Sequence, residues 1–166
     1  ESDAATGAAA QMMRANALAQ KGQGQVIELI DSGIDTSHQA FAGDMDAASL
    51  RYTQDSVASL ASQLGAGKGG VWVSPKIPFA YDYADGDNDA SPAKTPYGSH
   101  GTHVAGIAAG NADKIVGTAP NTQVIVAKVT RSEDDALLDS ALLASLDDML
   151  VLHPDVINLS LGWTAG

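Results

Sequence analysis

Two short segments carry residue types that are typical of hydrolytic chemistry. Asp31 follows an apolar run in Ile-Asp-Ser-Gly-Ile-Asp at residues 30–35, and His100 lies in Gly-Ser-His-Gly-Thr-His-Val-Ala-Gly at residues 98–106. A serine hydroxyl becomes a good nucleophile when an imidazole takes its proton, and a carboxylate must orient that imidazole and stabilise its cation. Asp31 and His100 are therefore candidates for the carboxylate and the base of a Ser-His-Asp triad.

Both segments also allow readings without catalysis. Asp-Ser-Gly after a strand is typical of a simple turn. Two histidines three residues apart on a helix, His100 and His103, could share a metal ion, although His38 and His153 stand in no motif that would complete the site. The pair could also be structural histidines. We favour His100 as the base and expect a structural role for His103.

The elements that must position these residues alternate between apolar strands and helices. The patterns predict strands at 26–30, 77–83, 123–129 and 156–160, and helices at 6–20, 53–64, 104–109 and 135–152. Such alternation is typical of parallel βαβ units and therefore of an α/β fold. Function in these sheets gathers at the carboxyl ends of the strands, where both Asp31 and Ser160 fall.

Composition excludes several classes of function. The chain has 166 residues, a net charge of -11 and no cysteine. The charge argues against nucleic acid or an anionic membrane surface as a partner. The lack of cysteine excludes a disulfide framework, a thiol nucleophile and a thiolate metal site. We find neither a membrane-spanning run nor a signal peptide, and expect one domain over residues 1–166.

Four segments in order resemble the subtilases. They are residues 26–38, 99–106, Gly-Thr-Ala-Pro at 117–120 and Val-Ile-Asn-Leu-Ser-Leu-Gly at 156–162. Asp before His is also the subtilisin order. The resemblance implies a subtilisin-like three-layer α/β fold with a mostly parallel central sheet, present in part, and a serine endopeptidase activity.

The same resemblance implies a role for each site residue. Asp31 would orient His100, which would act as general base and then general acid. Ser160, Leu161 and Gly162 would form a backbone wall that pairs with an extended peptide substrate. Ser160 is therefore a poor candidate for the nucleophile.

The long interval between Asp31 and His100, with the segment at residues 76–85, is similar to the Gram-positive cell-envelope subtilases of the lactocepin and C5a-peptidase group. This implies a secreted or cell-envelope protein. Residues 1–166 would be the N-terminal part of its catalytic domain, inactive alone, because the nucleophilic serine and the oxyanion asparagine are expected outside them. The partner would be the missing C-terminal part, or a second copy by self-association. The rival hypothesis is a non-catalytic subtilase-like binding or scaffold module.

Calcium is the cofactor to consider, and the pattern argues against the usual high-affinity site. Subtilisins usually follow the histidine of the first motif with Pro-Asp, whereas His38 precedes Gln39 and Ala40, and the loop at 110–115 is short. Three aspartates alternate at residues 85, 87 and 89 as in a calcium loop, but we favour a solvated acidic loop there. We assign no residue to a metal, and calcium stays the one cofactor that this family resemblance leaves open.

Two charged features stay outside this scheme. Glu28 lies in the middle of an apolar strand, where a carboxylate is costly unless it is paired or protonated. The acids within residues 131–135 could favour basic substrate residues. We prefer to interpret them as a solvated helix N-terminus that is stabilised by the helix dipole.

Overall fold

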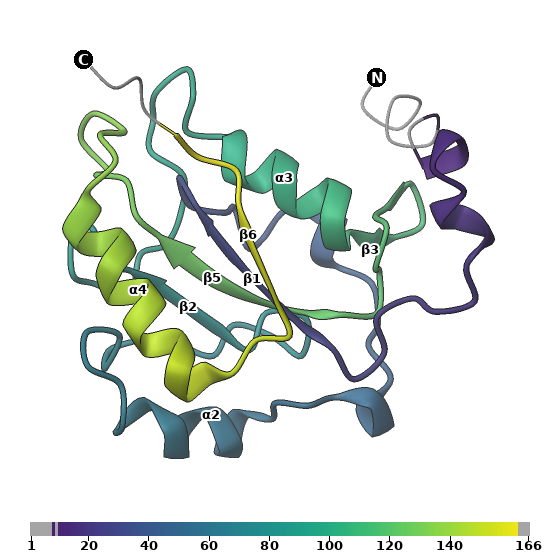
Figure 1. Ribbon diagram of the computed structural model, residues 1–166, viewed down its shortest axis with the longest axis horizontal. Coiled ribbons are helices and arrows are strands. Elements are labelled where there is room, and N and C mark those ends of the chain that lie inside the picture. Colours follow the sequence, from purple (N-terminus) through teal and green to yellow (C-terminus); the bar gives the residue numbers. More distant parts are fainter. Residues whose placement is uncertain (1–7, 9, 163–166) are drawn as a thin grey trace.

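The computed structural model describes residue 8 and residues 10–162 as three layers, with helices on both faces of a central sheet (Figure 1). The sheet has the order β2-β5-β1-β6, and every neighbouring pair is parallel. The strands are β1 (Val26–Asp31), β2 (Phe79–Asp82), β5 (Gln123–Lys128) and β6 (Val156–Leu159). The predicted α/β class with a parallel sheet is confirmed.

The strands form where apolar residues run without alternation, because helices cover both faces of this sheet. All six residues of β5 are buried. Register sets the strand ends side by side: Asp31 of β1 pairs with Lys128 of β5, which pairs with Asp82 of β2. Three charged residues therefore lie abreast at the carboxyl edge of the sheet.

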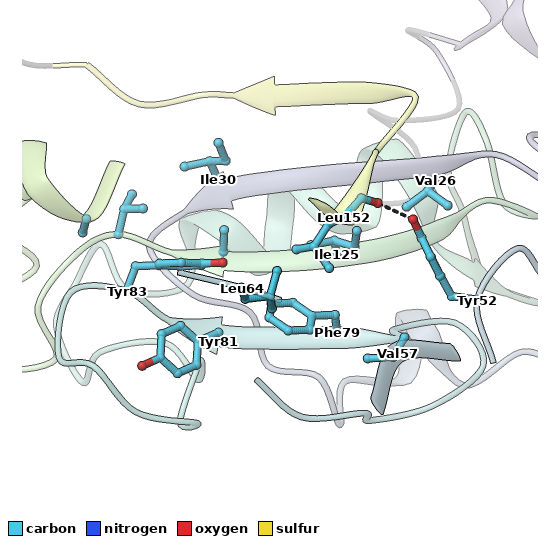
Figure 2. Close-up of a cluster of buried hydrophobic side chains, with 13 residues drawn as sticks. Val26, Ile30, Tyr52, Val57, Leu64, Phe79, Tyr81, Tyr83, Ile125 and Leu152 are labelled. Carbon is cyan, nitrogen blue, oxygen red and sulfur yellow. Dashed lines mark hydrogen bonds between the residues drawn. The ribbon is translucent and has the colours of Figure 1, made fainter. Parts of the chain in front are cut away.

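Two helices and an aromatic cluster cover one face. The two helices are α2 (Gln54–Ala61), which begins with a capping box between Thr53 and Ser56, and α4 (Asp139–Leu152). Figure 2 shows the side chains of this face, which include Phe79 and Tyr81 of β2 and Tyr83 directly after β2. The Tyr52 hydroxyl donates to the carbonyl of Leu152 and so joins the segment before α2 to the end of α4.

The opposite face is covered by α3 (His100–Ala109) together with the short 3-10 turn η2 (Gln39–Phe41). Small residues allow the helix to lie close to the sheet: Ala105 and Ala109 are both fully buried in the cluster that contains Leu29 of β1. This close packing fixes the position of His100, because His100 is the first residue of α3.

The remaining short elements connect these layers. Another 3-10 turn, η3 (Ala47–Ser49), precedes α2. The hairpin of β3 (Asn111–Ala112) and β4 (Ile115–Val116) follows α3. The sequence patterns did not predict this hairpin, because strands of two residues have no periodicity to detect. Across residue 8 and residues 10–162, no helix is long and apolar enough to cross a membrane.

The predicted helix at 6–20 is wrong over its C-terminal part. Arg14 has a positive φ of 55°, a 3-10 turn η1 (Ala15–Ala17) follows, and Leu18 is extended. A left-handed residue stops a right-handed helix, although the residue types favour helix. The start of this prediction, residues 6, 7 and 9, lies outside the described residues.

The predicted helix at 135–152 begins four residues later, at Asp139. Asp135 has a φ of 57°, and Thr130 pairs with Leu137 in an antiparallel bridge, so residues 130–137 fold back as a turn. The acids of residues 131–135 therefore do not form the N-terminus of α4, and the interpretation based on the helix dipole is wrong.

One edge of the sheet is open in the described residues. β6 pairs with β1 on one side, and Val156, Ile157 and Leu159 are 56%, 37% and 44% exposed. An apolar edge strand with free backbone groups is a ready surface for further strand pairing.

Candidate active site

Asp31 is the last residue of β1 and is almost fully buried, with 1% of its surface exposed. Its Oδ1 accepts two hydrogen-bond contacts, one from the backbone N–H of Ser32 at 2.7 Å and one with Nδ1 of His100 at 2.7 Å. Its Oδ2 is buried without a partner among the described residues. The carboxylate is thus fixed in place, with its bound oxygen facing the histidine.

His100 is the first residue of α3, and its side chain is 43% exposed. Helix α3 begins four residues earlier than the predicted helix at 104–109, so the imidazole is carried on the first turn of a rigid element. Because Asp31 holds Nδ1, the other ring nitrogen, Nε2, is left to act on a substrate or a nucleophile. This is the arrangement that a general base requires.

The backbone at Gly101 explains how the pair can be so close. A Cβ atom at this position would lie 2.3 Å from the carbonyl oxygen of Gly33 and 3.0 Å from Oδ1 of Asp31. The first contact is sterically impossible and the second is tight, so only glycine lets the first turn of α3 approach the end of β1 this closely. The glycine after the histidine is therefore part of the site's geometry.

A cleft of about 1050 Å³ lies in front of the imidazole. His100, His103, Ser160, Leu161, Gly162, Thr130 and Asp135 are among the residues that line it. The structure thus places the predicted base, His100 of α3, and the predicted backbone wall, from the segment after β6, around one cleft. A concave site at the carboxyl ends of the strands is the expected place for function in an α/β protein.

A family model described as the subtilase family matches residues 22–165 of the chain. The chain belongs to the subtilase family. Its order of segments, its parallel sheet and the Asp31–His100 contact agree with the resemblance seen in the sequence.

Two kinds of relatives support a finer placement of this subtilase. The PII-type proteinase of Lactococcus lactis subsp. cremoris is 36% identical over 156 residues, which cover 88% of this chain and 8% of the relative. The C5a peptidase of Streptococcus pyogenes serotype M6 is 30% identical over 149 residues, 86% of this chain and 12% of the relative. The predicted likeness to the lactocepin and C5a-peptidase group is confirmed, and the chain spans about a tenth of these relatives' length.

Among solved structures, the CspB protease of Clostridium perfringens resembles this subtilase with a TM-score of 0.55 and 22% sequence identity. The match covers 89% of this chain and 31% of that protein. At this identity the likeness concerns the fold alone. It confirms the subtilisin-like three-layer architecture, of which the chain forms a part.

Ser160 lies in the cleft of the subtilase, but its hydroxyl is not paired with the base. Its Oγ accepts a hydrogen bond of 2.9 Å from the side-chain amide of Asn158, and the described residues show no hydrogen bond between Ser160 and His100. That Ser160 is a poor candidate for the nucleophile stays a prediction.

The other histidines of the subtilase make different contacts, although His38 and His103 both line the cleft. His103 is exposed on α3 and lines the cleft, His38 accepts a hydrogen bond from the backbone of Ala40 through Nδ1, and His153 ends α4 in a left-handed conformation. No group of three or more metal-binding side chains occurs within residue 8 and residues 10–162. The alternative in which His100 and His103 share a metal therefore gains no support.

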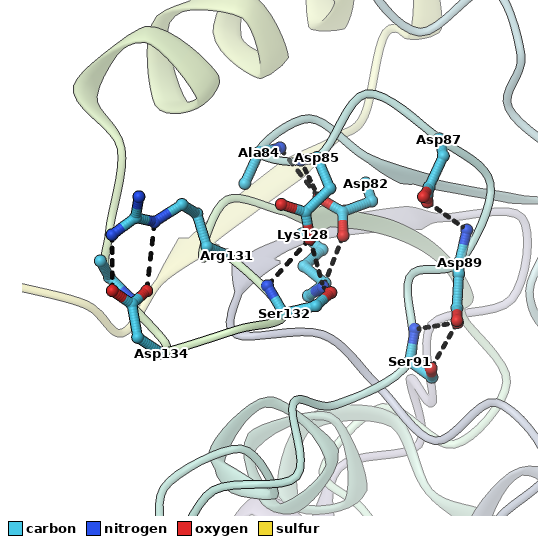
Figure 3. A network of polar contacts seen from close by, with 11 residues as sticks. Asp82, Ala84, Asp85, Asp87, Asp89, Ser91, Lys128, Arg131, Ser132 and Asp134 are labelled. Carbon is cyan, nitrogen blue, oxygen red and sulfur yellow. Dashed lines mark hydrogen bonds and ion pairs between the residues drawn. The ribbon is translucent and has the colours of Figure 1, made fainter.

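The acidic loop of the subtilase ties itself together through hydrogen bonds (Figure 3). Asp87 accepts from the backbone N–H of Asp89, and Asp89 accepts from the backbone and the hydroxyl of Ser91. These bonds from Ser91 hold the pKa of Asp89 below its ordinary value. Aspartates that cap successive backbone groups are typical of a turn. The solvated acidic loop stays a prediction, with calcium as its alternative.

The sequence analysis did not predict the buried ion pair between Lys128 of β5 and Asp82 of β2. Lys128 and Asp82 are both fully buried, and the Lys128 Nζ lies 2.5 Å from Oδ2 of Asp82 and 2.5 Å from the hydroxyl of Ser132 (Figure 3). Burial raises the pKa of the Asp82 carboxyl, and the hydrogen bond from Lys128 acts against this shift. Asp85 accepts from the backbone of Ser132 at 2.8 Å, so the turn after β5 is anchored to β2.

The turn at 130–137 forms part of one wall of the cleft. Arg131 and Asp134 form an exposed ion pair at 2.5 Å, while the Asp135 carboxylate accepts a hydrogen bond from the Thr95 hydroxyl. These acids are thus already engaged within the protein. A preference for basic substrate residues stays a prediction. The contacts that Asp134 and Asp135 make within the protein argue against it.

Proposed function

We propose that the chain supplies Asp31 and His100 to the Ser-His-Asp triad of a serine endopeptidase. The observation that carries this proposal is the 2.7 Å contact between the buried carboxylate of Asp31 and Nδ1 of His100 at the floor of a large cleft. Membership of the subtilase family and proteinase relatives support the same reaction.

The roles of the two residues follow from their environments. Asp31 holds the imidazole in the tautomer whose Nε2 can accept a proton, and its negative charge stabilises the imidazolium that then forms. His100 takes the proton from a serine hydroxyl as the serine attacks the peptide carbonyl, and then gives it to the leaving amine. The acyl-enzyme is hydrolysed by water through the same base.

The nucleophilic serine and the oxyanion-hole amide would come from residues outside 1–166. The cleft leaves the exposed side of His100 open to receive them. We therefore propose that this chain alone is inactive, and that its main partner is the C-terminal part of the same catalytic domain, packed beside the open edge of β6.

Substrate binding would use the backbone that follows β6. Ser160, Leu161 and Gly162 line the cleft in a segment without regular structure, directly after an edge strand. An extended peptide can add to such a segment through main-chain hydrogen bonds, so affinity would depend little on sequence and specificity would come from pockets. The substrate class is therefore peptides or proteins in extended conformation.

We propose a location outside the cell, secreted or at the cell envelope. The likeness to the PII-type proteinase and the C5a peptidase over most of the chain supports it.

The test is hydrolysis of a fluorogenic peptide by the full-length protein and by Asp31→Asn. The neutral amide keeps the shape of the side chain but favours the wrong tautomer of His100, so we expect kcat to fall by about 10⁴-fold with the fold intact. A matched control is Asp134→Asn, which removes an exposed carboxylate in a surface ion pair.

The two candidate functions predict different results. An active wild type that loses activity only in Asp31→Asn supports the peptidase. A folded full-length protein that binds peptide without cleaving it would support the rival binding or scaffold module. Equal activity of the wild type and Asp31→Asn would exclude the proposed triad.

A further inference from the structure

Two side-chain hydroxyls join the loop after β1 to the first turn of α3. The Oγ of Ser32 accepts a hydrogen bond from the backbone N–H of Gly101 at 3.2 Å and donates to the carbonyl of Gly98 at 3.3 Å. The Oγ1 of Thr102 accepts from the backbone N–H of Asp35 at 2.9 Å. One hydroxyl comes from each side, so the two segments hold each other.

These contacts surround the catalytic pair on both sides. Ser32 directly follows Asp31, and Gly98, Gly101 and Thr102 all lie within two residues of His100. A shift of α3 along or around its axis would lengthen the contact between Asp31 and His100, because the imidazole moves with the first turn. Each hydroxyl contact opposes such a shift.

The N-terminus of α3 shows why an external contact is needed. The first backbone N–H groups of a helix have no partner within the helix, and a serine at the N-cap usually binds one of them. Ser99 occupies the N-cap of α3 but makes no such bond, because its backbone is in a helical conformation. Ser32, from another segment, binds the N–H of Gly101 in its place.

We propose that Ser32 and Thr102 are positioning residues that set the register of α3 and thereby hold His100 against Asp31. The inference rests on the proposed triad and adds to it two residues that also line the cleft and whose hydroxyls act through the position of His100. Ser32 is 5% exposed, and its hydroxyl already makes both hydrogen bonds within the protein.

The test compares Thr102→Val with Thr102→Ser in the full-length protein. Valine keeps the shape of threonine but removes the acceptor for Asp35, whereas serine keeps it. We expect kcat to fall about 10-fold in Thr102→Val with KM changed less than 2-fold, and to stay within about 3-fold of wild type in Thr102→Ser. Ser32→Ala should resemble Thr102→Val.

The double variant Ser32→Ala/Thr102→Val tests whether the contacts act together. Each hydroxyl alone still restrains α3, so removing both should lower kcat by more than the product of the single losses. The acid limb of the pH profile of kcat/KM should move as well, because His100 is less well held by Asp31. A matched control is Thr118→Val, an exposed threonine in the turn after β4.

The outcomes separate this inference from the proposed function. If Asp31→Asn abolishes activity but Thr102→Val keeps wild-type kcat and pH profile, the positioning role is wrong while the triad stands, even if the melting temperature falls. If Asp31→Asn keeps full activity, the triad itself is wrong. A kcat loss that Thr102→Ser restores supports the proposal.

Discussion

At the scale of single residues, Glu28 is the feature that neither the fold nor the reaction uses. It is fully buried in β1, and both carboxylate oxygens lack a partner among the described residues. Burial, with a smaller effect of the Asp148 carboxylate, raises its pKa from 4.5 to about 8. Asp148 itself accepts hydrogen bonds from the backbone of Gly65 and Gly67 and from the Tyr83 hydroxyl, so it is the better hydrogen-bonded of the two buried acids.

This pKa predicts how stability depends on pH. Between pH 4.5 and 8 the unfolded chain releases a proton that folded Glu28 retains, so the stabilisation is complete below 4.5 and is lost as the pH rises toward 8. Glu28→Gln removes this dependence. The free energy of unfolding of Glu28→Gln minus that of wild type should rise by up to about 5 kcal/mol across this window.

Chemical denaturation at several pH values measures this difference. Glu133→Gln is the matched control, because Glu133 is exposed. A difference between Glu28→Gln and wild type that stays constant from pH 4.5 to 8 would contradict the assignment of a protonated, buried Glu28.

At the scale of secondary-structure elements, the predicted bounds of the four long strands lie within two residues of the observed bounds. The predicted starts of α3 and α4 are each four residues from the observed starts. Residue 26 begins both the predicted and the observed β1, because burial on both faces leaves a clear pattern. Helix α4 begins late because Asp135 adopts a positive φ that its residue type does not reveal. Backbone conformations of this kind depend on tertiary contacts.

The residues of the site also divide into those that local motifs predict and those that depend on tertiary contacts. Asp31 and His100 could be paired from motifs, because their order and neighbours are specific. Lys128 and Ser32 could not, since their roles depend on which strands lie side by side and on how α3 approaches β1. No local pattern in the sequence states either fact.

Helix α3 offers a test of the close approach at its first turn. Gly101→Ala would place a Cβ 2.3 Å from a backbone oxygen, whereas Gly106→Ala in the same helix would meet only Ile115 at 3.9 Å. We expect Gly101→Ala to lower the free energy of unfolding by about 3 kcal/mol and to separate His100 from Asp31. Gly106→Ala should be neutral or stabilising by about 0.5–1 kcal/mol.

Thermal unfolding of both variants measures this contrast. Equal effects of Gly101→Ala and Gly106→Ala on the free energy of unfolding would show that the close approach of α3 to β1 at Gly101 is not required. Activity of the full-length variants should follow the same order.

At the scale of the whole molecule, the open edge of β6 dominates the expected behaviour. Apolar side chains at 156, 157 and 159 lie beside free backbone groups. Edge strands of this kind pair with other chains unless something covers them. The high negative charge opposes association only in part, because salt screens it.

We therefore expect residues 1–166, expressed alone, to self-associate above the monomer mass of 16.9 kDa in light scattering. Leu159→Lys places a charge on the edge strand and should shift the sample toward monomer. Met12→Lys, which changes a methionine that is 87% exposed away from β6, serves as control. A clean wild-type monomer that binds no apolar dye would contradict this expectation.

The central claim is that His100, oriented by Asp31, activates a serine supplied from outside residues 1–166. Fluorophosphonate labelling of the full-length protein, read on a denaturing gel, tests it directly beside His100→Ala and the control His153→Asn. The account predicts strong labelling of wild type and His153→Asn, and its loss in His100→Ala. Equal labelling of His100→Ala, or no labelling of a folded wild type, would contradict it.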